Sequence, residues 1–191
     1  MYGGEVLARS STIYAMKKII FLLLLFPLSI FAAKKPQQAV VNLISYKADG
    51  TILASGYGFL LSAEGKTVVP YTLLEGAVRA EVIDAKGKRY PVRRIVGASS
   101  TYDLAVVTLQ SEKPQFDFFT VAKDSARVGE TLTLYQYTTS KKAKPVTVEM
   151  KVVTPYDGLH YYETTAANEH LNFGCPLLNH AGEVVGMVQR N

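Results

Sequence analysis

The sequence predicts an all-β domain, and two observations carry this prediction. Short apolar and β-branched segments recur along the chain, and turn residues such as Asp49-Gly50, Glu64-Gly65 and Lys86-Gly87 separate them. After residue 33, no stretch keeps an apolar period of 3.6 residues for the length of a substantial helix. Regularly spaced short strands with turns between them are typical of an antiparallel sandwich or barrel.

The predicted strands form two sets. The first set, at about residues 38–110, contains six strands: Val40–Tyr46, Ala54–Ser62, Thr67–Tyr71, Arg79–Asp84, Arg89–Val96 and Leu104–Leu109. A polar connector covers about residues 111–129. The second set, at about residues 130–191, contains five strands: Thr131–Tyr137, Val146–Thr154, Leu159–Thr165, Pro176–Leu178 and Val184–Gln189. Residues 34–191 fit one domain of ordinary size or a domain of two small barrels.

The N-terminal segment predicts export. From Met16, which is an alternative start, Lys17-Lys18 precede an apolar run from Ile19 to Phe31 that ends at Ala32-Ala33. A short cationic segment, about 7–15 apolar residues and small residues at the end describe a secretory signal peptide. The run falls short of the roughly 20 apolar residues of a membrane-spanning helix, although an uncleaved anchor is the alternative. We expect residues 1–33 to be a signal peptide and residues 34–191 to be periplasmic or extracellular, without a stable membrane span after cleavage.

Composition argues against disulfide bonds, nucleic-acid binding and a metal or other cofactor. Cys175 is the only cysteine, so no intramolecular disulfide can form and packed apolar strands must stabilise the fold. The formal charge is +5, with a basic cluster at Lys141–Lys144. Such a cluster can attract nucleic acid, but we expect the solvated tip of a hairpin and no nucleic-acid binding. Histidines and carboxylates do not show metal-ligand spacing, so we expect neither a metal nor another cofactor.

Five segments in chain order carry a resemblance to a known family. They are Ser55–Ser62, Leu73–Ala77, Tyr102–Val107, Thr164–Asn168 with Asn172–Asn179, and Gly182–Gly186. Together they are similar to the trypsin fold, and most closely to the secreted bacterial proteases of the HtrA type. This resemblance implies two six-stranded β-barrels with the active site in the cleft between them. Because five strands are counted in the second set, we expect an incomplete second barrel with an unpaired edge that favours pairing with another chain. A truncated coding sequence, a partner chain and the N-terminal arm remain as alternatives.

The resemblance also implies where catalytic residues would stand. The family mechanism needs a hydroxyl nucleophile, a histidine base, an orienting carboxylate and backbone donors for the oxyanion. Counted from the matching segments, the histidine position is Thr72, the aspartate position is Asp103 and the serine position is Phe173. A threonine hydroxyl is no general base near neutral pH, and a phenyl ring has no nucleophilic atom. Asp103 is either a remnant that accepts the Thr72 hydroxyl hydrogen or a cap of the loop before Leu104.

The segment that would form the oxyanion hole departs from the family pattern as well. Its equivalents are Leu171, Asn172, Gly174 and Cys175, so that Leu171 and Cys175 stand where the family has glycines. Glycine allows backbone geometry and close approach that other residues resist. We therefore expect this loop to stabilise a tetrahedral oxyanion poorly.

These replacements predict a secreted protease homologue without catalysis, which binds an extended peptide or a partner protein or serves as a scaffold. The alternative is an active serine- or cysteine-type endopeptidase with relocated residues. Cys175 is its candidate nucleophile, with His170 or His160 as the base, although a free cysteine is most often a small buried hydrophobe. A decaying gene product without a selected function is a third possibility.

Overall fold

The computed structural model describes residues 36–112, 115–137, 143–166 and 172–189, which belong to one compact unit, Lys34–Asn191. The predicted signal peptide, together with Lys141, Lys142, His170 and Leu171, lies outside the described residues. Within the described ranges, no helix has the length and hydropathy needed to cross a bilayer.

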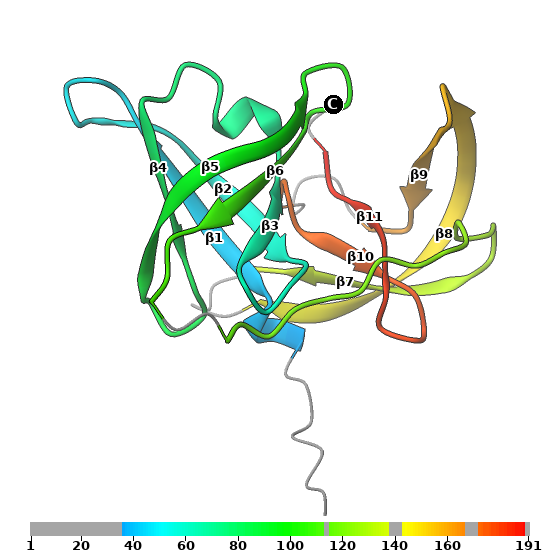
Figure 1. Ribbon diagram of the computed structural model, residues 1–191. Coiled ribbons are helices and arrows are strands. Elements are labelled where there is room, and N and C mark those ends of the chain that lie inside the picture. The colour runs from blue at the N-terminus through cyan, green and yellow to red at the C-terminus, as the bar shows by residue number, and fades with distance from the viewer. Residues whose placement is uncertain (1–35, 113–114, 138–142, 167–171, 190–191) are drawn as a thin grey trace, which may run out of the picture. The chain divides into compact units, whose positions relative to one another are not determined.

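The first half of the unit is a closed six-stranded barrel. Its strands are β1 (Val40–Tyr46), β2 (Ile52–Leu60), β3 (Lys66–Val69), β4 (Arg79–Ile83), β5 (Arg89–Ser99) and β6 (Leu104–Leu109). They pair in the order β1-β2-β3-β6-β5-β4, and β4 returns to β1 (Figure 1). Alternate residues point inward, as period-2 patterning predicts, and the core includes the fully buried Val41, Leu43, Leu60, Val82 and Val107.

The second half is a five-stranded sheet that curls into a nearly closed barrel. Its strands are β7 (Thr131–Gln136), β8 (Lys144–Tyr156), β9 (Leu159–Thr164), β10 (Pro176–Leu178) and β11 (Val184–Met187). They pair in the order β11-β10-β7-β8-β9. Two short 3-10 helices, η1 (Pro36–Gln38) and η2 (Tyr71–Leu73), complete the described elements.

The all-β prediction, with six strands and then five, is confirmed, while several strand ends differ. The expected strand Thr67–Tyr71 ends at Val69, because Pro70 has no N–H to continue a ladder and Tyr71–Leu73 form η2. β8 runs to Tyr156 rather than Thr154, because it forms a hairpin with β9. The Asp157-Gly158 turn has φ values of 46° and 78°, which suit the type I′ turn of a two-residue hairpin.

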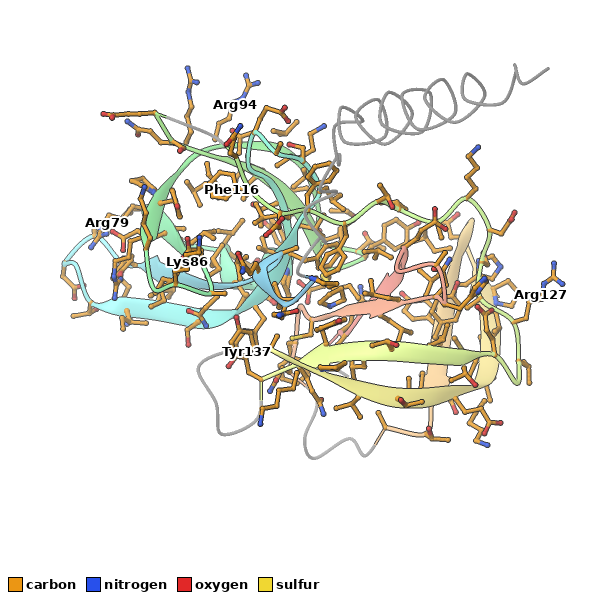
Figure 2. The ribbon with its side chains drawn as sticks, turned by 90° about the horizontal axis from the view of Figure 1, so that it is seen from below. Arg79, Lys86, Arg94, Phe116, Arg127 and Tyr137 are labelled. Carbon is orange, nitrogen blue, oxygen red and sulfur yellow. The ribbon has the colours of Figure 1, made fainter. Side chains whose placement is uncertain are left out.

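An aromatic pair joins the two halves. The rings of Tyr57 on β2 and Tyr137 after β7 are stacked, with centroids 4.4 Å apart, and the Tyr137 hydroxyl donates to the Val40 carbonyl at 3.2 Å. Figure 2 shows Tyr137 where the first barrel meets β7. Burial raises the pKa of Tyr137 to about 12. The phenol therefore stays neutral and remains a hydrogen-bond donor at physiological pH.

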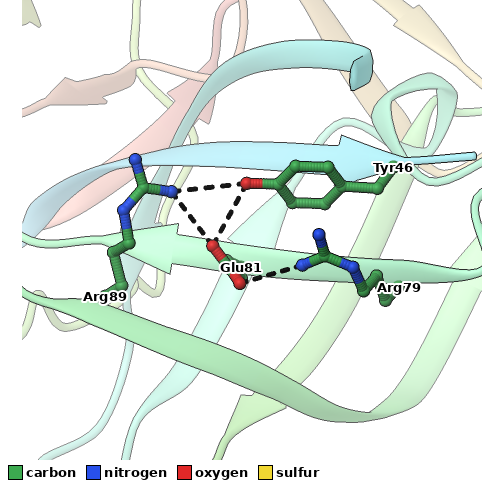
Figure 3. Close-up of polar contacts among 4 residues, drawn as sticks. All are labelled: Tyr46, Arg79, Glu81 and Arg89. Carbon is green, nitrogen blue, oxygen red and sulfur yellow. Dashed lines mark hydrogen bonds and ion pairs between the residues drawn. The ribbon is translucent and has the colours of Figure 1, made fainter. Parts of the chain in front are cut away.

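A charged cluster stabilises the face of the first barrel where β1, β4 and β5 lie side by side (Figure 3). Glu81 accepts hydrogen bonds from Arg79 at 2.9 Å, from Arg89 at 3.0 Å and from the Tyr46 hydroxyl at 3.2 Å. The Arg79 guanidinium also lies 3.7 Å from the centroid of the Tyr46 ring. The hydrogen bond from Arg89 is the largest cause of the lowered pKa of the Glu81 carboxyl.

One glycine sets how closely two strands of the first barrel approach. A Cβ added at Gly58 would collide with the Val68 carbonyl oxygen and lie 2.6 Å from Cγ1 of Val69. A Cβ added at Gly97 would have no heavy atom within 4 Å. We expect Gly58→Ala to lower the free energy of unfolding by about 1–3 kcal/mol or more, because the barrel is overpacked there. Gly97→Ala should leave the free energy of unfolding within about 0.5 kcal/mol of the parent value. Denaturant titration of both variants measures the difference, and equal effects of the two substitutions would contradict this account of packing.

Candidate functional site

Asp103 and Thr72, which are 31 residues apart in the chain, are joined by two hydrogen bonds. The Asp103 carboxylate accepts the backbone N–H of Thr72 at 2.8 Å and the Thr72 hydroxyl at 3.3 Å. Asp103 itself has a φ of 45°, in the left-handed region that aspartate visits more readily than most residues. The turn before β6 and the short helix η2 are thereby held together. The two bonds give Asp103 a structural role that links segments far apart in the sequence.

Phe173 is held against the first barrel through its backbone. The Tyr57 N–H donates to the Phe173 carbonyl at 3.1 Å. Next to it, Gly174 has a φ of 87°, and a Cβ there would collide with the Tyr57 carbonyl oxygen and lie 2.9 Å from Cδ of Pro70. Only glycine fits this position. The turn at Phe173 thus lies beside Pro70, two residues before Thr72, while the Phe173 side chain is 36% exposed.

Two backbone N–H groups in the described part of the predicted oxyanion loop are hydrogen-bonded within the fold. The Gly174 N–H donates to the Val188 carbonyl at 2.8 Å, and the Cys175 N–H donates to the Asn172 carbonyl at 3.2 Å. Among the described residues, the buried Oδ1 of Asn172 finds no hydrogen-bond partner. Both N–H groups are therefore used within the fold.

Cys175 lies inside the core of the second sheet. Its side chain is fully buried among apolar residues that include Leu134, Met150 and Leu177. Burial raises the pKa of the Cys175 thiol to about 12. The thiolate, which is the nucleophilic form, is therefore scarce at neutral pH and cannot be reached from solvent in this conformation.

His160 contacts a serine that its sequence position does not suggest. Nδ1 of His160, on β9, and the hydroxyl of Ser125, in the connector, lie 3.0 Å apart in a hydrogen bond, and both residues are exposed. The His160 ring also lies parallel to that of Tyr162, with centroids 6.3 Å apart. Sequence reasoning did not single out Ser125, because a separation of 35 positions carries no spacing signal. The other histidine that the structure describes, His180, is exposed at the turn between β10 and β11.

No set of three or more histidine, cysteine, aspartate or glutamate residues, among those that the structure describes, is arranged to hold a metal ion. The described residues of the candidate site therefore offer hydrogen-bonding groups, one exposed serine–histidine contact and apolar surface.

Comparisons with known proteins agree with this architecture. The family profile of the trypsin-like peptidase domain matches residues 43–187. A protein of Chlamydia trachomatis, described as a probable periplasmic serine endoprotease, DegP-like, is 31% identical over 138 residues; the match covers 69% of this chain and 27% of that protein. The crystal structure of the serine endoprotease from Yersinia pestis superposes with a TM-score of 0.62 at 18% identity, over 79% of this chain and 53% of that chain. The chain thus spans about a quarter of the curated relative that it matches.

Removing the Asp103 carboxylate should destabilise the fold. We expect Asp103→Ala to lower the free energy of unfolding by about 1–2 kcal/mol, the lower part of the range for hydrogen bonds to a charged group, since Asp103 is partly exposed. Asp124→Ala, at an exposed position, is the matched control and should change it by less than about 0.5 kcal/mol. Urea titration measures both variants. If the free energy of unfolding of Asp103→Ala equals that of the parent protein, the contacts of Asp103 with Thr72 contribute little to stability.

The Cys175 thiol should be unreactive in the folded protein. With a pKa of about 12 rather than about 9, its labelling by a thiol-directed probe at pH 8 should be roughly a thousandfold slower than in the urea-unfolded chain. Stopped-flow labelling under both conditions measures this ratio. Rapid labelling without denaturant would show an accessible thiol and would favour a cysteine-type enzyme.

Proposed function

Because this chain belongs to the trypsin-like peptidase family, we propose that it is a member without peptide-bond hydrolysis, which acts by binding an extended peptide or a partner protein. The proposal rests on Thr72 and Phe173, the residues that the family resemblance assigns to the positions of the base and the nucleophile. The Thr72 hydroxyl is no general base at neutral pH, and the Phe173 ring has no nucleophilic atom.

The surroundings of these positions support the same proposal. The Asp103 carboxylate, which in the family accepts a hydrogen bond from the histidine, here accepts two hydrogen bonds from Thr72. The N–H groups of Gly174 and Cys175 already serve internal carbonyls. What the family scaffold retains is a set of strands whose backbone can pair with an extended chain.

A second candidate function rests on the contact between Ser125 and His160. A serine hydroxyl within 3.0 Å of an imidazole nitrogen has the first two elements of an activated nucleophile. In this case the protein is a serine-type hydrolase whose catalytic pair has moved to the connector and β9. Among the described residues, no carboxylate forms a hydrogen bond with His160, and the pair lies on an exposed surface. Binding without hydrolysis is therefore our first proposal.

We further propose that the mature protein acts outside the cytoplasm. The predicted signal peptide of residues 1–33 supports export. The distant relative from Chlamydia trachomatis carries a periplasmic description. Extracellular release is the other destination that the signal peptide allows.

Hydrolysis assays on three matched proteins separate the two candidate functions. We expect the purified chain to leave unfolded casein and a fluorogenic peptide library intact over a day at pH 6–9, at the background rate of buffer. Asp103→Ala and Ser125→Ala should give the same background, because neither residue takes part in hydrolysis.

The outcomes that would contradict this are distinct. Turnover that disappears in Ser125→Ala and in His160→Gln would establish the second candidate function. Turnover that disappears in Asp103→Ala, in protein shown by circular dichroism to be folded, would overturn the proposed loss of catalysis at the family site.

A further inference from the structure

Strand β5 extends beyond the part of the first barrel in which it has two neighbours. It covers Arg89–Ser99, and β4 pairs with it only at Arg89–Pro91. From Val92 onward, β5 pairs with β6 on one side, and no other backbone group among the described residues pairs with its second side. The second side of Val92–Ser99, which we call the free edge of β5, therefore presents main-chain N–H and C=O groups to solvent.

Both faces of the strand are open to solvent along the free edge. All residues from Arg93 to Ala98 are exposed, and successive side chains of a strand point to opposite faces. Two of them are apolar, since Ile95 and Val96 are each 51% exposed. A Cβ added at Gly97 would have no heavy atom within 4 Å. An extended chain thus has room to lie along this edge, where it would cover apolar surface.

Contacts hold both ends of the free edge in place. At its start, Arg89–Pro91 pair with β4. Beyond its end, the Tyr102 hydroxyl donates to the Asp157 carboxylate at the tip of the β8–β9 hairpin, and the side-chain amide of Gln189 donates to the Tyr102 carbonyl. A strand that is held before binding loses less conformational entropy when a partner pairs with it.

Most of the positive charge of the chain is concentrated next to this edge. The segment from Arg79 to Arg94 has six basic and two acidic residues, a surplus of four, whereas the rest of the chain has fifteen basic and fourteen acidic residues. The six basic residues are Arg79, Lys86, Lys88, Arg89, Arg93 and Arg94. Arg79, Lys86 and Arg94 all lie on the first barrel (Figure 2). The surface around the free edge therefore attracts negative charge.

The arginines of this surface have hydrogen-bond donors to spare. Arg79 and Arg89 share the single carboxylate of Glu81 (Figure 3), and their side chains are 51% and 56% exposed. Within the described ranges, neither Arg93 nor Arg94 forms an ion pair. Because β4 begins at Arg79 and runs antiparallel to β5, Arg79 lies on the side of the free edge. Each guanidinium has five N–H donors and binds a carboxylate through two of them.

Charge decides which occupant suits the free edge. A second copy of this strand would bring Arg93 and Arg94 against the same arginines, and like charges opposite each other destabilise a strand pair. The residues of this chain outside the described ranges hold nine basic and two acidic residues, so they supply no acidic run. A nucleic acid would match the arginines through its phosphates but would leave the main-chain groups of the edge unpaired. An acidic polypeptide matches both features.

We propose that the free edge of β5 binds an extended, acidic segment of a partner polypeptide. The segment pairs with the main chain of Val92–Ser99 as an added strand. Its carboxylates bind the guanidinium groups of Arg79, Arg93 and Arg94, and apolar residues between them cover Ile95 and Val96. The inference rests on the proposed binding function and gives that function a site and a class of partner.

Defined peptides test this site in the full chain. The probes are fluorescein-labelled peptides of about eight residues in which Glu alternates with Val or Thr. We expect at least one to bind by fluorescence anisotropy in about 0.1 M NaCl and to slow hydrogen exchange at the backbone amides of Arg93–Ser99. In about 1 M NaCl the binding should be at least tenfold weaker, because the screening length falls from about 10 Å to about 3 Å.

Three control ligands separate strand pairing from charge attraction. The same peptide with N-methylated alternate amides keeps its carboxylates but cannot pair, and it should bind at least tenfold more weakly. Equal binding of the two peptides would overturn the added strand. A peptide with Lys in place of Glu should not bind. Single-stranded oligothymidine that binds more tightly than every acidic peptide and protects the same amides would overturn a polypeptide as the occupant.

Two double variants with the same change of net charge test the position of the site. Arg93→Glu with Arg94→Glu should weaken binding of the acidic peptide at least tenfold. Lys123→Glu with Arg127→Glu, at exposed positions in the connector, should leave binding within about twofold of the parent. Circular dichroism checks that both variants are folded. Equal weakening by the two double variants would show attraction to net charge alone and would overturn the site.

The remaining outcomes distinguish the site from the proposed function. Slow exchange at Arg93–Ser99 in the chain without peptide would show that the edge is already covered, which would overturn the site. Failure of every peptide to bind, or protection only elsewhere, would also overturn the site and leave the proposed function intact. Cleavage of a bound peptide, detected by mass spectrometry, would instead overturn the proposed function.

Discussion

The two halves of the domain meet at a backbone contact that tolerates only glycine on one side. The Tyr57 N–H reaches the Phe173 carbonyl, and Gly174 lies against the Tyr57 carbonyl with a φ of 87°. Any side chain at Gly174 would push the turn away from β2. The stack of Tyr57 on Tyr137 and the position of the Phe173 turn beside Pro70 both depend on this close approach.

Hydrogen bonding and burial account for several residues of the candidate site through the stability of the fold, without a catalytic role. Asp103 holds the turn before β6 to η2, Cys175 fills the core of the second sheet, and the Gly174 N–H links the Phe173 turn to the end of β11. Each of these residues has a structural partner that accounts for its position. Their presence is explained by folding, and a catalytic role is not required to explain it.

Much of the fold could be predicted from the sequence, because alternating apolar residues and turn glycines act locally. The strand set and its division into six and five follow from such patterns, whereas the end of β3 depends on Pro70 and the extension of β8 depends on pairing across Asp157-Gly158. Contacts between distant segments could not be predicted in this way. The bond between Ser125 and His160 and the contact of Tyr102 with Asp157 arise only when the connector and the hairpin meet in three dimensions.

The pairing of Asp103 with the main-chain N–H of Thr72 has a consequence for how genomes are annotated. That bond needs an acceptor at residue 103 but makes no demand on the side chain at residue 72, since every amino acid except proline offers the same donor. The stability of the barrel is thus a sufficient reason for a carboxylate at residue 103, whatever side chain stands at residue 72. An aspartate at this position is therefore poor evidence for turnover.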